Sequence, residues 1–360
     1  MATFQKADGQ NYAPEGQFNP VCKKGEFKFA AVGLEHGHIY GICNGVTEVG
    51  AQLVYVYDSD AKRVAEFIAR YPDVKAAASY EEILRDPEIE LIVCASIPKD
   101  RAAVGIAAME HDKDFFADKP SVVTLAQLNE VKRVSARSGK KYMTYYSERF
   151  HTECTYKARE LVKDGAIGKV VNVIVSAPHR INRPSRPAWF FNKDYYGGIL
   201  CDLGCHMLEQ FIDYADTEEV TIISSRVANF ANKDYPKFDD FGDMVVQSAN
   251  GVTGYGRLDW FTPEKLPVWG DGRMIITGTK GYIELRKYID IGHSDDGDHL
   301  YLVSDSRSEH LELAGKVGYP FFGKLLLDCI HRTENALSQS RAFRAMELSL
   351  IAQNMAIKIE

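Results

Sequence analysis

The chain has 360 residues, of which 45% are hydrophobic, and it carries a formal net charge of −7 at pH 7. This length suggests two domains or one large one, and the apolar content is enough for a sizeable core. The acidic balance, without a dense basic run, argues against a nucleic-acid partner, and no apolar run reaches the ~18 residues of a membrane span.

Residues 1–26 are predicted to form an N-terminal extension, because they are polar and show no clear periodicity. They lack the continuous apolar segment of a signal peptide. The seven cysteines are scattered and odd in number, which fits reduced, mostly buried thiols better than a disulfide framework. We therefore expect a cytoplasmic protein.

Residues 27–148 alternate between short apolar runs and helical segments. The predicted strands are 27–32, 53–57, 89–94, 115–117 and 141–145, and the predicted helices are 39–49, 61–71, 80–84, 98–110 and 124–138. Strands and helices that alternate with short connections are typical of a doubly wound parallel sheet. We therefore predict an α/β domain over this range.

The pattern changes in residues 149–360, where several strand-like runs follow one another without helices between them. The predicted strands are 170–176, 220–227, 243–248, 253–260, 273–277, 282–286 and 299–303, and the predicted helices are 152–164, 197–214, 321–337 and 342–357. Consecutive strands of this kind indicate a largely antiparallel, open-faced sheet flanked by helices. We expect this α+β domain to bind substrate and to mediate oligomerisation, with its last helix packing back towards the first domain.

A glycine turn follows the first predicted strand. Gly33 opens a turn into a helix, whose N-terminus would hold a pyrophosphate. Asp58 ends the second strand, where a carboxylate accepts hydrogen bonds from the adenosine ribose and repels a 2′-phosphate. In a G-x-G-x-x-G register, however, Glu35 and His38 occupy the second and third glycine positions. These residues favour NAD over NADP, with altered pyrophosphate contacts.

The segment 196–206 carries polar residues at fixed spacing within an apolar run. If it is helical after Gly198, Asp202 and His206 lie four residues apart on one face, where the carboxylate would raise the pKa of the imidazole. Such a pair suits a general acid/base near neutral pH, although an ordinary surface ion pair is the simpler interpretation. Cys201 and Cys205 lie about 100° around the helix from this face, so we predict no metal site.

Several motifs resemble those of the glucose–fructose oxidoreductase / inositol dehydrogenase (Gfo/Idh/MocA) family over roughly residues 27–360. The family's Glu-Lys-Pro signature reads Asp118-Lys119-Pro120 here, and its glycine run followed by D-x-G-x-H reads 197–206. Segments 146–151 and 165–169 are also similar to the family's motifs. The departures are Asp118 in place of Glu and the altered glycine fingerprint.

The resemblance implies an N-terminal Rossmann domain and an NAD(P)-dependent dehydrogenase acting on CH–OH groups. The implied catalytic residues are Lys119, Asp202 and His206. The expected cofactor-binding residues are Gly33, Leu34, Glu35, His36, Gly37, His38, Asp58, Ser96, Pro98 and Lys119, and the candidate substrate residues are Arg149, His179, Arg186 and Trp189.

The leading hypothesis is therefore an NAD-dependent enzyme that oxidises a ring CH–OH of a sugar, sugar derivative or cyclitol. Two alternatives stay open: redox-neutral glycosidase chemistry through a 3-keto sugar, and a non-catalytic regulator that binds nucleotide and sugar. The loop 178–191 mixes arginines and aromatic residues, which suits either a sugar site or a subunit contact. We expect a homodimer or homotetramer, with a small polyol or sugar as the substrate.

Overall fold

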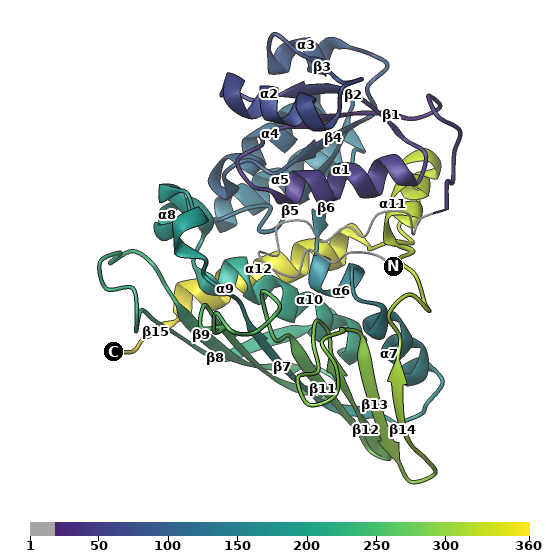
Figure 1. The fold of residues 1–360 in the computed structure, drawn as a ribbon, viewed down its shortest axis with the longest axis vertical. Helices are drawn as coiled ribbons and strands as arrows, with labels where there is room; N and C mark the ends of the chain where they lie inside the picture. Colours follow the sequence, from purple (N-terminus) through teal and green to yellow (C-terminus); the bar gives the residue numbers. More distant parts are fainter. Residues whose placement is uncertain (1–18) are drawn as a thin grey trace.

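The computed structural model describes residues 19–360, which form two β-sheets with helices around and between them (Figure 1). Most of the predicted N-terminal extension lies outside the described residues. Among the described residues, no helix combines the length and the apolar character needed to cross a bilayer.

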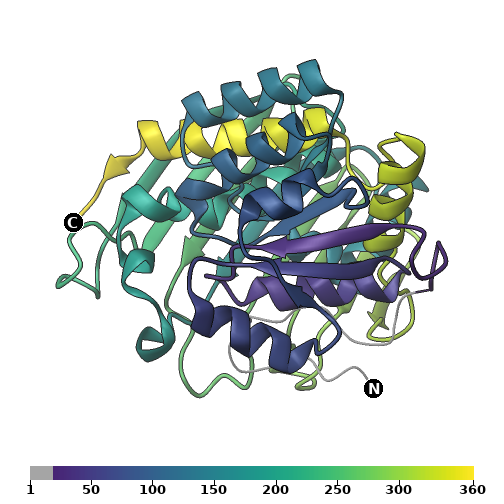
Figure 2. The ribbon, with the colours of Figure 1, turned by 90° about the horizontal axis from the view of Figure 1, so that it is seen from above.

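The first sheet has six parallel strands in the order β3-β2-β1-β4-β5-β6. The strands are β1 (Lys28–Val32), β2 (Gln52–Tyr57), β3 (Lys75–Ala76), β4 (Leu91–Cys94), β5 (Asp114–Asp118) and β6 (Tyr142–Tyr145). The helices are α1 (His38–Glu48), α2 (Ala61–Arg70), α3 (Tyr80–Arg85), α4 (Pro98–Glu110) and α5 (Leu125–Ser138). Helices α1 and α2 cover one face of the sheet, and α4 and α5 cover the other (Figure 2). The predicted doubly wound parallel sheet is confirmed.

Local sequence signals explain several of these boundaries. The Asp60 carboxylate accepts a hydrogen bond from the Lys62 N–H and caps α2. Thr124 caps α5 through Gln127, and Gly139 ends that helix with φ = 69°, a left-handed conformation that glycine adopts without strain.

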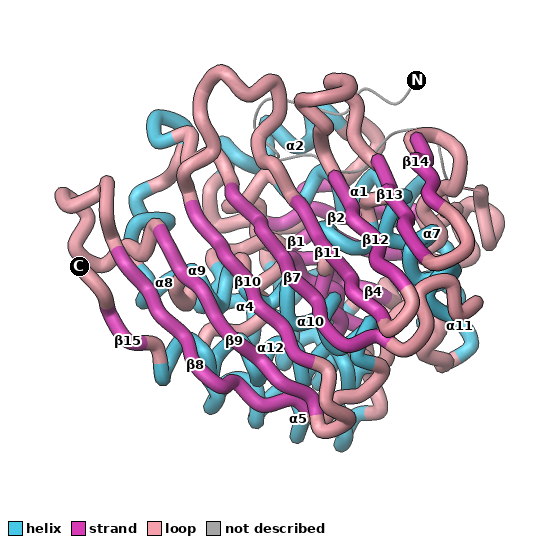
Figure 3. The backbone as a smooth tube through the Cα atoms, turned by 90° about the horizontal axis from the view of Figure 1, so that it is seen from below, coloured by secondary structure: helices cyan, strands magenta, loops and turns pink. Residues whose placement is uncertain are grey.

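The second sheet has nine strands in the order β14-β13-β12-β11-β7-β10-β9-β8-β15. These strands are β7 (Val170–Pro178), β8 (Val220–Ala228), β9 (Phe241–Ser248), β10 (Thr253–Asp259), β11 (Arg273–Gly278), β12 (Gly281–Arg286), β13 (His299–Ser304), β14 (Ser308–Glu312) and β15 (Ile357–Lys358). Only the β7–β10 and β8–β15 pairs are parallel, so the prediction of a largely antiparallel sheet is confirmed. Helices pack on one face, and the other face is open (Figure 3).

The helices of this second part differ in two places from the expectation. The predicted helix 197–214 is divided into α9 (Ile199–Asp202) and α10 (Gly204–Ala215), because the chain turns at Leu203. The predicted helix 321–337 ends early, as α11 (Phe321–His331), because the Asp328 carboxylate accepts hydrogen bonds from the residues that follow it, including the Ala336 N–H at 2.7 Å. The remaining helices are α6 (Ser147–Phe150), α7 (Glu153–Lys163), α8 (Lys193–Tyr196), α12 (Gln339–Met355), η1 (Arg183–Ser185) and η2 (Ala188–Phe191).

Helix α12 runs between the two sheets (Figure 1). Its start covers the edge strand of the first sheet: the Tyr142 N–H donates to the Gln339 side chain at 2.6 Å, and the Tyr146 hydroxyl donates to the Ala342 carbonyl at 2.9 Å. The other end of the helix packs along β8. The C-terminal helix therefore joins both sheets.

Candidate active site

A pocket opens where the carboxyl ends of β1, β4 and β5 face the loops that follow β7 and β10. In the first sheet β1 lies beside β4, at the point where the strand order reverses, and ligands of doubly wound sheets bind at this point. The lining residues are His36, His38, Pro98, Arg101, Lys119, His179, Arg180, Arg186, Trp189, Phe190, Tyr196, Asp202, Trp260 and Trp269. Both halves of the chain thus contribute walls.

An ion pair joins the two halves inside this pocket. The Lys119 ammonium lies 2.8 Å from an Asp202 carboxylate oxygen, and both residues are buried. Burial alone would lower the pKa of Lys119, but the carboxylates of Asp202 and Asp118 outweigh it and raise that pKa above its usual value. Lys119 is therefore a fixed positive charge in the pocket.

His206 does not form the expected pair with Asp202. Leu203, between α9 and α10, keeps a right-handed helical backbone, and the Asp202 carboxylate contacts Lys119 instead. The His206 ring is 2% exposed, its Nδ1 has no hydrogen-bond partner, and it is not among the residues that line the pocket. Burial, followed by the charge of Lys119, lowers the pKa of His206 well below its usual value. The predicted raised pKa is thus wrong, and the imidazole is neutral.

A second imidazole, that of His179, lies in the pocket wall itself. Its Nδ1 lies 3.1 Å from the Ala177 carbonyl, which fixes the proton on Nδ1 and leaves the lone pair on Nε2. Nε2 lies 3.5 Å from the Glu148 carboxylate. Burial, followed by the charge of Lys119, also lowers the pKa of His179 well below its usual value.

Asp118, which replaces the family's glutamate, is buried between two partners, His38 and Arg101. Its carboxylate lies 2.8 Å from His38 Nδ1 and 3.2 Å from the Arg101 guanidinium. Burial would raise the pKa of Asp118, but His38 and Arg101 hold it well below its usual value. Arg101 also donates to the Ser96 and Pro120 carbonyls, so it joins the start of α4 to the end of β5. Sequence reasoning missed Arg101, which is one of several charged residues in the first turn of α4 and has no motif around it.

Three of the four candidate substrate residues line the pocket: His179, Arg186 and Trp189. The Arg186 guanidinium lies over the Phe190 ring and donates to the Ile181 carbonyl at 3.0 Å. Both contacts lie within the loop 178–191, and the same guanidinium also lies over the ring of Trp260, another lining residue.

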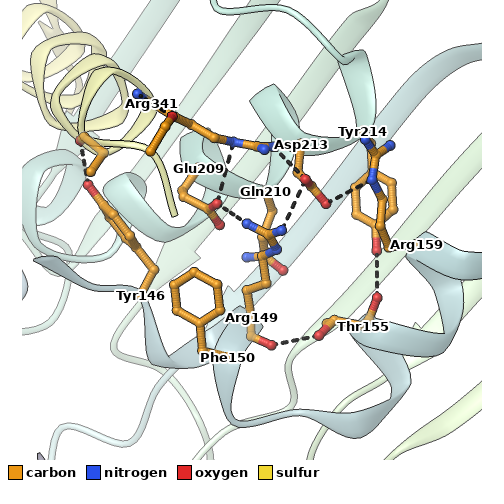
Figure 4. Close-up of polar contacts among 12 residues, drawn as sticks. Tyr146, Arg149, Phe150, Thr155, Arg159, Glu209, Gln210, Asp213, Tyr214 and Arg341 are labelled. Atoms are coloured by element: carbon orange, nitrogen blue, oxygen red, sulfur yellow. Dashed lines mark hydrogen bonds and ion pairs between the residues drawn. The ribbon is translucent and has the colours of Figure 1, made fainter. Parts of the chain in front are cut away.

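The fourth candidate, Arg149, lies outside the pocket lining and belongs to a buried ion network (Figure 4). Its guanidinium contacts the Glu209 carboxylate and lies 3.0 Å from Asp213. Arg341 of α12 contacts the same two acids, and Arg159 of α7 approaches Asp213. Arg149 therefore joins α6, α10 and α12, and the prediction that it contacts substrate is corrected.

The expected nucleotide turn lies around the N-terminus of α1. Gly33 has φ = 75°, and a Cβ there would lie 2.5 Å from the Ser96 Cβ, so β1 and β4 need glycine at this point. Gly37 is the N-cap of α1 and makes no side-chain cap. The His36 and His38 rings turn towards Asp118 and the pocket.

Asp58 ends β2 and already has several partners. Its carboxylate accepts hydrogen bonds from the Leu34 N–H at 2.7 Å, the Asp60 N–H at 2.8 Å and the Arg63 guanidinium at 2.8 Å. Glu35 lies 3.5 Å from the same guanidinium, so its carboxylate turns towards Arg63. The donor set fits a dinucleotide, because an uncapped helix N-terminus and a carboxylate at the second strand bracket one crevice.

Beneath the pocket lies another buried pair that sequence reasoning did not identify. Lys287 donates to the Glu148 carbonyl at 2.8 Å and to the Gln210 side chain. Burial lowers the pKa of Lys287 and raises that of Glu148. The segment 146–151 was singled out for its arginine, whereas its glutamate is the residue that faces His179.

A parallel nucleotide-binding sheet joined to an open-faced sheet, with a lysine–carboxylate pair between them, defines a nucleotide-dependent oxidoreductase. Two family models match the chain: "Oxidoreductase family, NAD-binding Rossmann fold" over residues 27–146, and "GFO/IDH/MocA C-terminal domain" over residues 155–284. The chain belongs to the Gfo/Idh/MocA oxidoreductase family, which confirms the resemblance seen in the sequence.

Known proteins support this assignment. A crystal structure of a putative oxidoreductase from Erwinia carotovora atroseptica SCRI1043 is 44% identical, covers 93% of this chain and 100% of that chain, and superimposes with a TM-score of 0.91. D-xylose dehydrogenase from Paenarthrobacter nicotinovorans is 24% identical over 60% of this chain and 55% of its own length. The aldose-aldose oxidoreductase from Caulobacter crescentus, solved with glycerol, is 17% identical with a TM-score of 0.73, and covers 91% of this chain and 97% of its own; it shares the fold.

Proposed function

We propose that this chain oxidises a ring CH–OH of a sugar, sugar derivative or cyclitol with NAD. The observation that carries the proposal is the buried Lys119–Asp202 pair in a pocket that also holds neutral imidazoles and aromatic walls. Sugar hydroxyls need directional polar partners, while their C–H faces pack on rings such as Trp189. The similarity to sugar dehydrogenases points to the same substrate class.

In this proposal the nicotinamide, when bound, accepts the hydride, and the protein handles the proton. Lys119 stabilises the oxygen as negative charge develops on it, because its ammonium is fixed and buried. Asp202 holds that ammonium in place and offers an acceptor to a neighbouring hydroxyl. His206 takes the proton, since burial keeps its ring neutral and its Nδ1 lacks another partner.

The direct test is a screen of aldoses, sugar acids and cyclitols with purified protein and NAD, with NADH absorbance as the readout. NADH formation on at least one ring alcohol is expected, and a Lys119→Met variant should abolish it. Product formation from a glycoside without net NADH would identify redox-neutral chemistry instead. Ligand binding without turnover on any substrate, with either nucleotide, would identify a regulator.

We also propose NAD rather than NADP as the cofactor, because the Asp58 carboxylate would repel a 2′-phosphate. Arg63 lies beside it and is the group that would favour NADP. Calorimetry should give tighter binding of NAD, and Asp58→Ala should weaken NAD by about tenfold or more through the lost ribose contact. Arg63→Ala is the matched control and should leave NAD preferred. Equal or tighter binding of NADP by the wild type would contradict the assignment.

Two further proposals concern the oligomeric state of the enzyme and its location in the cell. A homodimer or homotetramer is supported by apolar side chains on the open sheet face, among them Ile174 and Val245. A cytoplasmic location is supported by the seven cysteines, which are all free.

A further inference from the structure

Four metal-ligating side chains lie together on the second sheet, and none of them lines the pocket. His293 comes from the loop between β12 and β13, His299 begins β13, and His310 and Glu312 belong to β14. One ligand atom from each lies within 4.8 Å of those of the others. We call this group the His293–Glu312 cluster.

The strand register explains why these residues meet. His299 pairs directly with Glu312 across the β13–β14 ladder, and Tyr301 pairs with His310. Because side chains alternate along a strand, His310 and Glu312 project from the same face as His299 and Tyr301. This face also carries Ile174, which the strand pairing places in the same row as Tyr301 and His310. The cluster therefore lies on the open face, at its β14 side.

The loop that supplies His293 is fixed to the sheet. The Asp290 carbonyl accepts hydrogen bonds from the N–H groups of His293 and Ser294, both at 2.8 Å. The Asp290 carboxylate in turn contacts Arg286 at 2.7 Å and the Tyr301 hydroxyl. His293 is thus held over the two strands, with its Nε2 2.7 Å from the Glu312 carboxylate.

The contacts of the His299 ring indicate which of its two nitrogens carries the proton. Its Nε2 lies 3.2 Å from the Asp296 carbonyl and 3.2 Å from the Ser294 hydroxyl. A proton on Nε2 satisfies the carbonyl and leaves the Nδ1 lone pair directed at His310 Nε2, 2.9 Å away. Metal-binding histidines are commonly oriented in this way, by donating the other ring N–H to a carbonyl.

The ring of His310 is also fixed. It stacks on Tyr301 with 4.3 Å between the ring centroids and 5° between the planes, and the His293 ring meets its edge at 90°. His299 is 1% exposed, whereas His293, His310 and Glu312 are exposed to solvent. The cluster is thus preorganised at its base and open to an ion from outside.

We propose that the His293–Glu312 cluster binds a divalent transition-metal ion, Zn²⁺ being the physiological candidate. Three imidazoles and one carboxylate form a four-ligand donor set suited to tetrahedral zinc. Ligand atoms around zinc at about 2.0–2.1 Å are roughly 3.3 Å apart, so the present 2.7 and 2.9 Å separations need to open by about half an ångström.

Because all four positions are filled by the protein, the metal would act as a structural clip and not as a catalyst. It would fasten the β12–β13 loop to β13 and β14. The four ligands are dispersed along residues 293–312 without a compact zinc motif, so no local pattern in the sequence indicates the site. Strand register, and not sequence spacing, brings them together.

The test uses the full-length protein, freed of any polyhistidine tag and of metal by dialysis against a chelator. Calorimetric titration with ZnCl₂ should show one more bound equivalent in the wild type than in His310→Ala. Zinc should also raise the Tm of the wild type by more than it raises that of His310→Ala. Glu312→Gln, a conservative change at an exposed position, should weaken the affinity by at least about tenfold. The control His111→Ala removes an exposed histidine on α4's C-terminal side and should behave as the wild type.

Co²⁺ provides an independent readout of the ligands. Its absorption should show the visible bands of a tetrahedral site without a thiolate charge-transfer band. Equal zinc stoichiometry and affinity in the wild type, His310→Ala and Glu312→Gln would overturn the proposal, as would a thiolate band. The His36, His38 and Asp118 side chains of the pocket are present in every variant, so zinc bound there cancels in the comparison.

Discussion

Lys119 and His206 share one buried environment but carry different charges. A buried amine beside Asp202 keeps its proton, because the carboxylate lies 2.8 Å away. A buried imidazole without such a partner loses its proton, because burial disfavours the charged ring and Lys119 disfavours a second positive charge. In the free enzyme, the fixed cation of the pocket therefore shares a buried environment with a neutral imidazole.

The first prediction concerns which imidazole takes the proton. His206→Ala should lower turnover by about 10²–10⁴-fold, the usual contribution of general acid–base catalysis, with little change in NAD affinity. His179→Ala is the informative comparison, because that ring lines the pocket and should affect KM more than kcat. Steady-state kinetics on a verified substrate give both values. Turnover at the wild-type level in His206→Ala, together with a large kcat loss in His179→Ala, would show that His179 is the base.

The second prediction concerns pH and stability at His151. This ring is buried against Tyr319 and Phe322 and contacts the Tyr145 hydroxyl, and burial lowers its pKa to about 3. Below about pH 6.5 the unfolded chain binds a proton at this histidine that the folded chain does not, so this contribution to stability is lost as the pH falls from about 6.5 towards about 3.

Urea unfolding at a series of pH values measures this effect. Between about pH 6 and 4.5, the wild type should lose about 1.4 kcal/mol more per pH unit than His151→Gln, which cannot take up that proton. Parallel stability curves for the two proteins would show that His151 does not titrate as buried histidines do.

At the scale of elements, the approach of α9 to α12 depends on one glycine. Gly198 precedes α9 with φ = 90° and ψ = 165°, a conformation almost confined to glycine. A Cβ there would lie 2.3 Å from the Gln353 side chain, whose oxygen accepts the Leu200 N–H at 2.9 Å. The residues that lead to Asp202 are positioned by this close contact.

The third prediction concerns the contact between Gly198 and Gln353. Gly198→Ala should lower the free energy of unfolding by roughly 1–3 kcal/mol through backbone strain, and by more through the clash. Gly251→Ala is the matched control, since Gly251 has φ = 91° with nothing within 4 Å of an added Cβ. Thermal and urea unfolding should show the larger loss at Gly198. Equal losses at the two glycines would mean that Gln353 moves aside without cost.

Much of the element order could be predicted because apolar runs and caps carry the signal. The helix 98–110 was predicted with the bounds that α4 has, and the alternation through β6 indicated a parallel sheet. β14 was missed because Ser308–Glu312 alternates mostly polar residues, and its role as a strand comes from pairing with β13. The break between α9 and α10 was missed because the apolar pattern continues through Leu203.

The site was predictable to the extent that it lies in short motifs. Lys119 and Asp202 lie in such motifs, and the structure brings them together. Arg149 was misplaced because an arginine in a motif looks the same whether it faces substrate or Glu209. Arg101 and Glu148 were missed because their positions depend on how α4 and α6 pack, which no local pattern records.

At the scale of the whole molecule, the open sheet face carries a continuous apolar row. Val245, Tyr255, Ile174 and Ile275 are paired across four neighbouring strands, and Ile174 and Val245 are 38% and 37% exposed. An exposed apolar row in the middle of a wide sheet is typical of a surface that a second subunit covers.

Light scattering should therefore give a mass of at least twice the 40.4 kDa chain at micromolar concentration. Ile174→Lys should shift the protein towards the monomer, because a charge would be buried in the contact. Ile330→Lys is the control: Ile330 is 40% exposed on α11, away from this face, and its replacement should leave the mass unchanged. A wild-type monomer would contradict the proposed assembly.

The contact of α12 with β6 also has a consequence for synthesis on the ribosome. β6 is an edge of the first sheet, and its cover at Tyr142 comes from Gln339, 197 residues later in the chain. At about 5–20 residues per second, translation leaves that edge uncovered for roughly 10–40 s. During this interval the nascent first sheet presents an unpaired strand to neighbouring chains, so its exposure to aggregation ends only when the start of α12 has been translated.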